Sequence, residues 1–209
     1  MPIKAFIFDC GGVVLRARQN NVYQRWEERF GYAAGQLTER LWTSEAYRRA
    51  EIGQLTEEAF WAEIASDLPL TEPQQISELR QDLWGVFEPN EKVLAWVDHL
   101  RSSYRVVILS NATEVLDEML RDRFQIASRF DMIFNSARLG LAKPDPAVYR
   151  EVLRHLGITA SEAVFIDDRA ENIASAAMVG LHVLWFVGDQ ELDRQLQVYL
   201  DHDNPLSSH

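Results

Sequence analysis

The sequence lacks several features that would each indicate a particular class of protein. Its 209 residues include one cysteine, Cys10, so an intrachain disulfide is excluded. The net charge is −11 and no basic run is present, so we expect neither nucleic acid nor an anionic membrane as a partner. The first apolar stretch breaks at Asp9, too early for a signal peptide or a membrane span. These absences predict a soluble protein of a reducing compartment, most simply the cytoplasm.

What the sequence does contain is a series of short apolar runs separated by amphipathic segments. The runs are mostly continuous in apolar character, as in parallel strands that are covered on both faces. The segments between them carry Val, Leu, Ile and Ala at helical spacing. This alternation predicts an α/β fold with a doubly wound parallel-sheet (Rossmann-like) core. The predicted strands are 6–8, 105–109, 132–134, 163–166 and 182–186, and the predicted helices are 91–101, 115–124, 147–156 and 171–178.

The stretch 17–88 differs from the rest because it contains no convincing strand. It is rich in Glu, Arg, Gln, Leu and Trp, and Thr56 with the acids after it has the pattern of a helix start. We therefore predict a small α-helical cap inserted after the first strand. The polar tail after Leu200 is expected to be frayed. The predicted domains are an α/β core of 1–16 and 89–209 and a helical cap of 17–88.

Polar clusters follow several of the predicted strands at the point where each strand ends. Open α/β sheets place their chemistry at this edge. Asp9 could attack phosphorus to form an acyl phosphate if a metal ion screens the charge repulsion. Taken alone, an aspartate before glycines is more simply a turn residue, and only the other clusters favour a nucleophile. The clusters are Asp9, Ser110-Asn111, Lys143-Pro144 and Asp167-Asp168.

The other clusters supply the remaining parts of a phosphoryl-transfer site. The adjacent carboxylates of Asp167 and Asp168 repel each other unless a cation lies between them, although an acid here can also cap the next helix. Ser110 and Asn111 carry groups that can bind a phosphoryl oxygen, but both are also ordinary N-cap residues. The prolines at 144 and 146 fix the backbone next to Lys143, and this lysine can bridge the nucleophile and the phosphate. Together these groups predict metal-assisted phosphoryl transfer.

In this order and spacing, the four clusters resemble the motifs of the haloacid dehalogenase-like (HAD) hydrolases over nearly the whole chain. More narrowly, they resemble the branch with a helical cap after the first strand. The resemblance implies that Asp9 is the phosphoryl-accepting nucleophile, that Ser110 holds a phosphate oxygen and that Lys143 is the catalytic lysine. It also implies Mg²⁺ as the cofactor. The implied metal ligands are Asp9, Asp167, Asp168 and the main-chain carbonyl of Gly11.

Gly11 departs from the family pattern, in which this position is an aspartate that acts as general acid and base. Glycine cannot transfer a proton, and such help is worth roughly a hundred- to ten-thousand-fold in rate. The Asp-x-Gly pattern is, however, similar to that of sugar-phosphate phosphatases, so glycine does not exclude activity. An anomeric sugar phosphate or an acyl phosphate, with its good leaving group, would need the missing acid least.

The sequence thus predicts an Mg²⁺-dependent phosphatase of a small phosphorylated metabolite, with a sugar phosphate as one candidate. The alternative is a non-catalytic phosphate-binding or regulatory protein, which only Gly11 favours. A haloacid dehalogenase needs no cation, so the Asp167-Asp168 pair argues against it, and a phosphomutase would need the acid missing at Gly11 even more. A dehydrogenase is disfavoured because the first turn lacks Gly-x-Gly-x-x-Gly.

The cap is expected to select the substrate. Most of its many aromatic residues should form the core of the cap, with one or two facing the substrate. Four arginines are candidates for holding a second anionic group, although each alone is more simply a solvated residue. They are Arg16, Arg18, Arg48 and Arg49.

Overall fold

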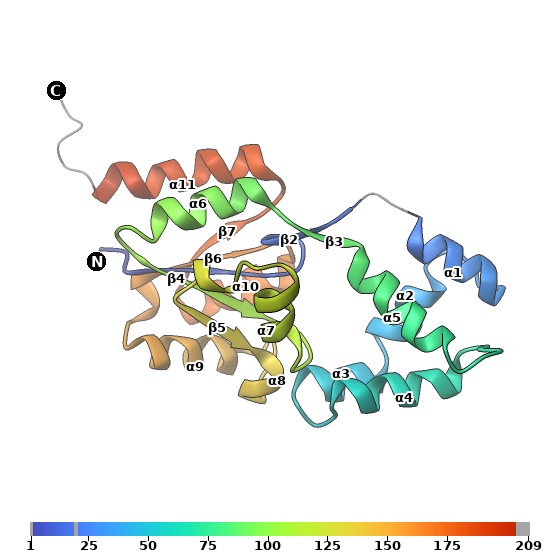
Figure 1. Ribbon diagram of the computed structural model, residues 1–209. Coiled ribbons are helices and arrows are strands. Elements are labelled where there is room, and N and C mark those ends of the chain that lie inside the picture. Colours follow the sequence, from blue (N-terminus) through green and yellow to red (C-terminus); the bar gives the residue numbers. More distant parts are fainter. Residues whose placement is uncertain (1, 19–20, 204–209) are drawn as a thin grey trace.

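Five parallel strands form the central sheet of the core, in the order β5-β4-β1-β6-β7. The computed structural model describes residues 2–18 and 21–203 (Figure 1). The predicted doubly wound parallel sheet is confirmed, and a strand lies at each of the five predicted positions. These strands are β1 (Ala5–Phe8), β4 (Arg105–Ser110), β5 (Met132–Asn135), β6 (Ala163–Asp167) and β7 (His182–Trp185).

Helices cover both faces of the sheet because successive side chains of a strand point to opposite faces. Phe6 and Phe8 pack with α6 and α11 on one face, while Ile7 packs with α9 and α10 on the other. Figure 1 shows α6 and α11 on one side of the sheet and α9 on the opposite side. The helices of the core are α6 (Glu91–Leu100), α7 (Leu116–Glu118), α8 (Ser136–Leu139), α9 (Pro146–Leu156), α10 (Ala170–Val179) and α11 (Asp189–Asp203).

Two segments of the core differ from the sequence prediction. The predicted helix 115–124 is divided into the short α7 and a π-helical turn, η1 (Met119–Arg123). The end of the chain was expected to be frayed after Leu200, but α11 continues to Asp203, and 204–209 lie outside the described residues. Two further turns, η2 (Ala127–Arg129) and η3 (Ala160–Glu162), are 3₁₀-helical.

The cap consists of helices that enclose an apolar core of their own. Thr56 begins α4 as predicted, because its Oγ1 accepts a hydrogen bond from the main-chain N–H of Ala59. Among the described helices, none is long and apolar enough to cross a membrane. The cap helices are α1 (Val22–Phe30), α2 (Gln36–Trp42), α3 (Glu45–Glu51), α4 (Glu57–Asp67) and α5 (Gln75–Gly85).

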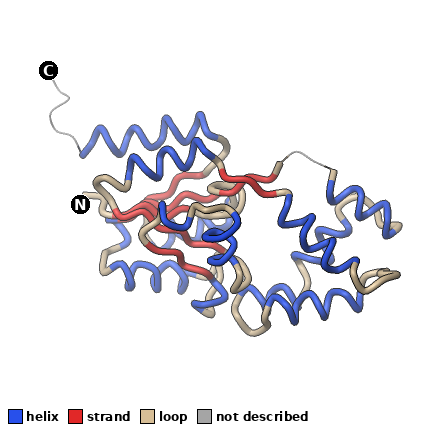
Figure 2. Tube along the Cα trace, in the orientation of Figure 1, coloured by secondary structure: helices blue, strands red, loops and turns tan. Residues whose placement is uncertain are grey.

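A two-stranded antiparallel ribbon joins the cap to the core (Figure 2). Its strands are β2 (Leu15–Ala17) and β3 (Phe87–Pro89), with Ala17 opposite Phe87. The predicted domain boundaries at 17 and 88 fall within this ribbon, where no strand was expected. Three residues per strand are too few to produce a recognisable period-2 pattern. Both crossings between the domains therefore run side by side.

Candidate active site

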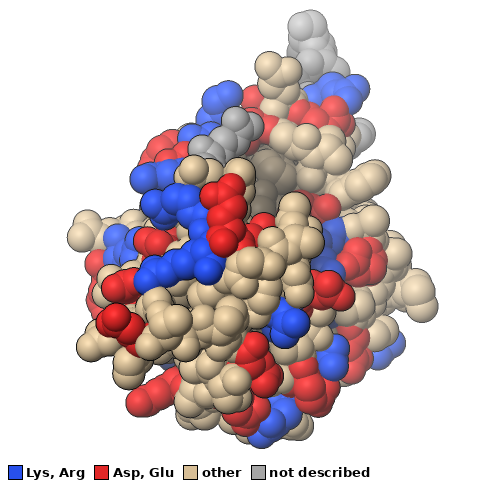
Figure 3. All heavy atoms as spheres, turned by 90° about the vertical axis from the view of Figure 1, so that its right-hand side faces the viewer, with Lys and Arg blue, Asp and Glu red and all other residues tan. Residues whose placement is uncertain are grey.

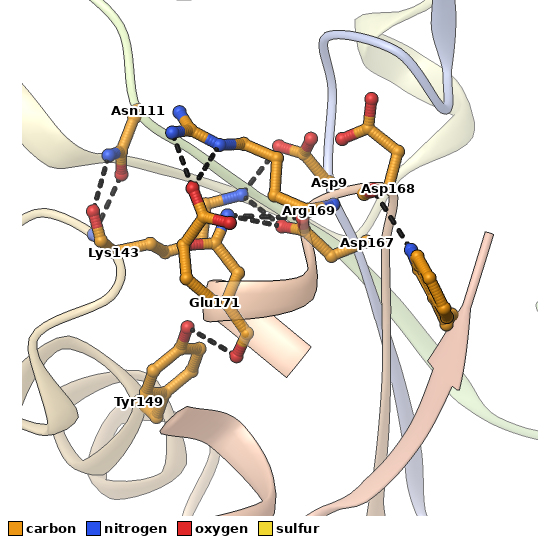
Figure 4. Close-up of polar contacts among 10 residues, drawn as sticks. Asp9, Asn111, Lys143, Tyr149, Asp167, Asp168, Arg169 and Glu171 are labelled. Carbon is orange, nitrogen blue, oxygen red and sulfur yellow. Dashed lines mark hydrogen bonds and ion pairs between the residues drawn. The ribbon is translucent and has the colours of Figure 1, made fainter. Parts of the chain in front are cut away.

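The polar clusters that follow separate strands meet at one edge of the sheet. Ser110 ends β4, Asp167 ends β6 and Asp9 directly follows β1. β1 pairs in parallel with both β4 and β6, and the register aligns the carboxyl ends of the three strands, so these ends lie together. Lys143 reaches the same point from the loop before α9, as Figure 4 shows. The fold thus gathers groups that are far apart in the chain.

Lys143 lies between two of the acids. Its Nζ donates to Oδ1 of Asp9 at 2.6 Å and to Oδ2 of Asp167 at 2.7 Å (Figure 4). The side chains are buried: Lys143 is 2% exposed, Asp9 is 8% exposed and Asp167 is 0% exposed. Burial alone would lower the pKa of Lys143, but its attraction to the two carboxylates outweighs this and raises the pKa. The lysine therefore remains a cation that compensates two buried anions.

Asn111 holds the main chain of Lys143 in place. Its Oδ1 accepts from the Lys143 main-chain N–H at 2.8 Å, and its Nδ2 donates to the Lys143 carbonyl at 2.7 Å. This geometry favours a positioning role for the Asn111 side chain over the predicted contact with phosphate. Ser110 is 4% exposed and lines the cavity next to the acids, where the predicted phosphate contact would require it.

The adjacent acids Asp167 and Asp168 lie in different environments. Asp167 is fully buried, and besides Lys143 its carboxylate accepts from the main-chain N–H of Arg169 at 2.8 Å and from Nδ2 of Asn172 at 3.0 Å. Asp168 is exposed. Part of its carboxyl group is still shielded from water, and this desolvation, together with the negative charge of Asp167, raises the pKa of Asp168. Asp167 is thus anchored within the protein, whereas Asp168 is exposed to solvent.

The three acids have the chemistry and spacing of a metal site. One carboxylate oxygen from each of Asp9, Asp167 and Asp168 lies within 4.8 Å of the other two. Oxygens on opposite sides of a Mg²⁺ ion are about 4.2 Å apart, because each Mg–O distance is about 2.1 Å. The hard oxygen donors therefore fit Mg²⁺ after small side-chain movements. Asp9 and Asp168 are the more available ligands because Asp167 already accepts hydrogen bonds from three groups.

Burial also changes the protonation of Asp9. Removal from water raises the pKa of Asp9 to about 6, against the opposing effect of Lys143 and with help from the nearby Asp167 and Asp168. A cation bound between the carboxylates would favour the charged form again. The adjacent thiol of Cys10 is 1% exposed, and burial raises its pKa far above the ordinary value. Cys10 is therefore a packed residue, as expected from the sequence, rather than a second nucleophile.

The two glycines after Asp9 are required to different degrees. Gly12 has φ +92°, and a Cβ atom there would lie 2.2 Å from Oδ2 of Asp168. Gly12 thus allows the first and last clusters to approach each other. A Cβ at Gly11 would meet no atom within 4 Å. Position 11 therefore has open space around a Cβ atom.

A cavity of about 380 Å³ lies between the cap and this edge of the sheet. The loops after β1 and β4 form its inner end, so the cavity adjoins the acids. Its cap wall includes Glu57, which sequence analysis identified only as part of a helix start. An acid in the first turn of a helix is ordinary, so no local signal distinguished it. The inner end comprises Cys10, Gly11, Ser110 and Asn111.

None of the four candidate arginines lines the described cavity. Arg16 and Arg18 both pair with Glu88, while Arg48 pairs with Glu45 and Arg49 with Glu63. Figure 3 shows the cap end of the molecule, where basic and acidic side chains are interspersed. These arginines are therefore paired surface residues.

An open parallel sheet that brings a buried carboxylate, its lysine partner and two further acids to its carboxyl edge defines an α/β enzyme with carboxylate-based chemistry. The family comparison identifies the group within this class. Residues 3–180 match the model of the haloacid dehalogenase-like hydrolases, and the chain belongs to this family. The predicted family is thus confirmed.

Two curated relatives match most of the chain. A sesquiterpene phosphatase of Aspergillus oryzae is 28% identical, covering 86% of this chain and 89% of the relative. A D-ribitol-5-phosphate phosphatase of Bacteroides thetaiotaomicron is 24% identical, covering 95% of this chain and 99% of the relative. Among solved structures, a HAD-family enzyme of the same bacterium in complex with magnesium and inorganic phosphate has a TM-score of 0.74 at 20% identity, covering 88% of this chain and 93% of that one. At this identity the structural likeness shows the fold.

Proposed function

We propose that this protein is an Mg²⁺-dependent phosphatase that hydrolyses a small phosphorylated metabolite through an aspartyl-phosphate on Asp9. The main support is the buried contact of Asp9 with Lys143, within reach of Asp167 and Asp168 and beside a cavity. Two relatives that match most of the chain are phosphatases by name, and a structure with the same fold binds magnesium and phosphate.

Each group near the cavity has a defined task in this reaction. A bound Mg²⁺, held by Asp9, Asp168 and Asp167 with the Gly11 carbonyl, would screen the charge between nucleophile and phosphate. A carboxylate oxygen of Asp9 forms a bond to phosphorus while the bond from phosphorus to the alcohol oxygen breaks. Lys143 balances negative charge at this point, and the Ser110 hydroxyl donates to a phosphoryl oxygen. Water then attacks the phosphorus of the acyl phosphate, releasing phosphate and restoring the carboxylate.

Protonation of the leaving alcohol is the step for which no side chain is evident. Gly11 supplies no proton donor, and Glu57 is the one acid among the described residues that line the cavity. Its Oε2 accepts from Oγ1 of Thr113 at 2.5 Å and its Oε1 pairs with Arg80 at 2.7 Å, so both carboxylate oxygens already have partners. We therefore infer that water protonates the leaving group, and that activated esters react faster than alkyl esters.

Release of inorganic phosphate from an activated aryl phosphate tests this proposal. The wild type should release phosphate with Mg²⁺ and much less with a chelator, and Asp9→Asn should lack activity in both conditions. Asp67→Asn, an exposed acid at the end of α4, serves as the matched control and should behave like the wild type. No turnover by a cooperatively folded wild type would refute the proposal and favour a phosphate-binding protein without turnover.

A further inference from the structure

We propose that the substrate is the monophosphate of a hydrophobic alcohol with roughly ten to fifteen carbon atoms, rather than of a polyol. This inference rests on the proposed phosphatase function and adds the chemical class of the alcohol. It follows from the lining, the polar contacts and the size of the cavity between the cap and the core.

The cap wall of the cavity is aromatic. The ring of Trp42 stacks near Phe60 at a centroid distance of 6.3 Å, and it meets Tyr47 edge-on at 5.0 Å and Trp61 edge-on at 6.4 Å. Such packed rings form a preorganised apolar surface, which favours an aliphatic or aromatic group over a hydrated one. The aromatic residues that line the cavity from the cap helices are Tyr23, Trp42, Tyr47, Phe60, Trp61 and Trp84.

The polar groups of this wall are largely engaged with one another. The Tyr23 hydroxyl accepts from Nε1 of Trp42 at 3.0 Å. Glu57 accepts from Nε1 of Trp61 at 3.2 Å and from Oγ1 of Thr113 at 2.5 Å. A sugar or polyol would exchange its hydrogen bonds with water for contacts with these rings. Each unpaired hydroxyl buried in this way is unfavourable, so the wall selects against polyhydroxylated groups.

Charge also restricts the ligand. Among the described residues that line the cavity there is no lysine or arginine, so no cationic side chain of the wall is available to pair with a second anionic group. The phosphate is therefore expected to be the single charged group of the substrate, bound at the inner end beside Ser110 and Gly11. The remainder of the molecule would extend toward the cap.

The size of the cavity sets the length of the apolar group. Its volume is about 380 Å³, whereas a dry cavity of about 150 Å³ holds a benzene ring. By proportion, the cavity has room for roughly ten to fifteen carbon atoms. Short alcohols would leave much of the aromatic wall without a partner.

A series of primary alkyl monophosphates isolates the contribution of the apolar group, because the reacting ester changes little along the series. Butyl, hexyl, octyl and decyl phosphate would be compared with glycerol 3-phosphate and ribitol 5-phosphate, each below its micelle concentration. We expect kcat/KM to rise with chain length, by up to about fourfold per methylene group. Equal or faster turnover of the polyol phosphates would overturn the proposal while leaving the phosphatase function intact.

A matched pair of tryptophan variants locates the effect. Trp84→Ala, in the cavity wall, should reduce the decyl-to-butyl ratio of kcat/KM roughly tenfold or more. Trp96→Ala removes a tryptophan of α6 that does not line this cavity and should leave the ratio unchanged. Equal ratios in the wild type and Trp84→Ala would contradict the proposed location.

Binding of alkylphosphonates, which cannot be hydrolysed, separates this proposal from the phosphatase function. Tryptophan fluorescence would be titrated with decylphosphonate and butylphosphonate in the presence of Mg²⁺. Tighter binding of decylphosphonate, on the order of a hundredfold, is expected. This result without turnover of any phosphate would support the hydrophobic site and refute the phosphatase. Equal binding of both compounds would refute the hydrophobic site, whatever the activity.

Discussion

The Nζ atom of Lys143 lies 2.6 Å from Oδ1 of Asp9, although the two residues are 134 positions apart in the chain. The same ammonium group contacts Asp167. One buried cation therefore compensates two buried carboxylates, one directly after β1 and the other at the end of β6. This arrangement links the stability of the protein, its response to pH and its affinity for a metal ion, because each depends on the charge balance at one point.

Lys143→Met should destabilise the metal-free protein by about 3–5 kcal/mol, because it leaves Asp9 and Asp167 buried without their cation. Mg²⁺ should restore part of this loss. Urea unfolding with a chelator and with Mg²⁺ measures both effects. Lys92→Met, at an exposed lysine 3.8 Å from Asp189, provides the control and should change little. Equal stability of the two variants would contradict the role assigned to Lys143.

The metal-free protein should lose stability as the pH rises through the range in which Asp9 ionises. The folded-state pKa of Asp9 is raised to about 6 from its ordinary value of 3.8. Its favourable contribution is therefore complete below the ordinary value and disappears as the pH rises through about 6, a change of about 3 kcal/mol. Urea unfolding of the wild type and Asp9→Asn with a chelator, from about pH 4.5 to about pH 8, should show about 2 kcal/mol of this change as a difference between the two proteins, because about 1 kcal/mol is already lost below pH 4.5. A difference that stays constant with pH would contradict the prediction.

The two acids after β6 should differ when each is replaced by its amide. Asp168→Asn should weaken Mg²⁺ binding by roughly tenfold or more and leave metal-free stability within about 0.5 kcal/mol, because the side chain is exposed. Asp167→Asn should reduce metal-free stability by about 3 kcal/mol, because it disrupts the buried contact with Lys143. Calorimetric Mg²⁺ titration and urea unfolding test both. Similar stability loss in the two variants would show that the acids are equivalent.

Gly11→Asp should increase the turnover of alkyl phosphates more than that of aryl phosphates. A Cβ atom at this position would meet no atom within 4 Å, so the first atom of the new side chain causes no clash. General acid help is worth roughly a hundred- to ten-thousand-fold, and only a poor leaving group benefits fully. The measurement is kcat for decyl phosphate and for an aryl phosphate, with Gly11→Asn as the isosteric control. Equal changes in Gly11→Asp and Gly11→Asn would argue against proton transfer.

Local patterns in the chain were sufficient to predict the sheet and the family. Each strand of the core contains a continuous apolar run, and parallel strands necessarily bring their carboxyl ends to one edge. Asp9, Ser110 and Asp167 could therefore be assigned to a common site before their distances were known. The short strands β2 and β3 were missed because three residues per strand carry no periodic signal.

The roles of individual side chains depended on contacts between distant segments, which leave no local pattern. The Asn111 amide holds the main chain of Lys143, and Glu57 of the cap meets Thr113 of the core. The aromatic residues of the cap have helical spacing whether they face the cap core or the cavity, so their number in the sequence did not reveal the wall they form. Side-chain burial and pairing are properties of the packed chain, and they distinguish Asp167, which is buried among hydrogen-bond donors, from its exposed neighbour Asp168.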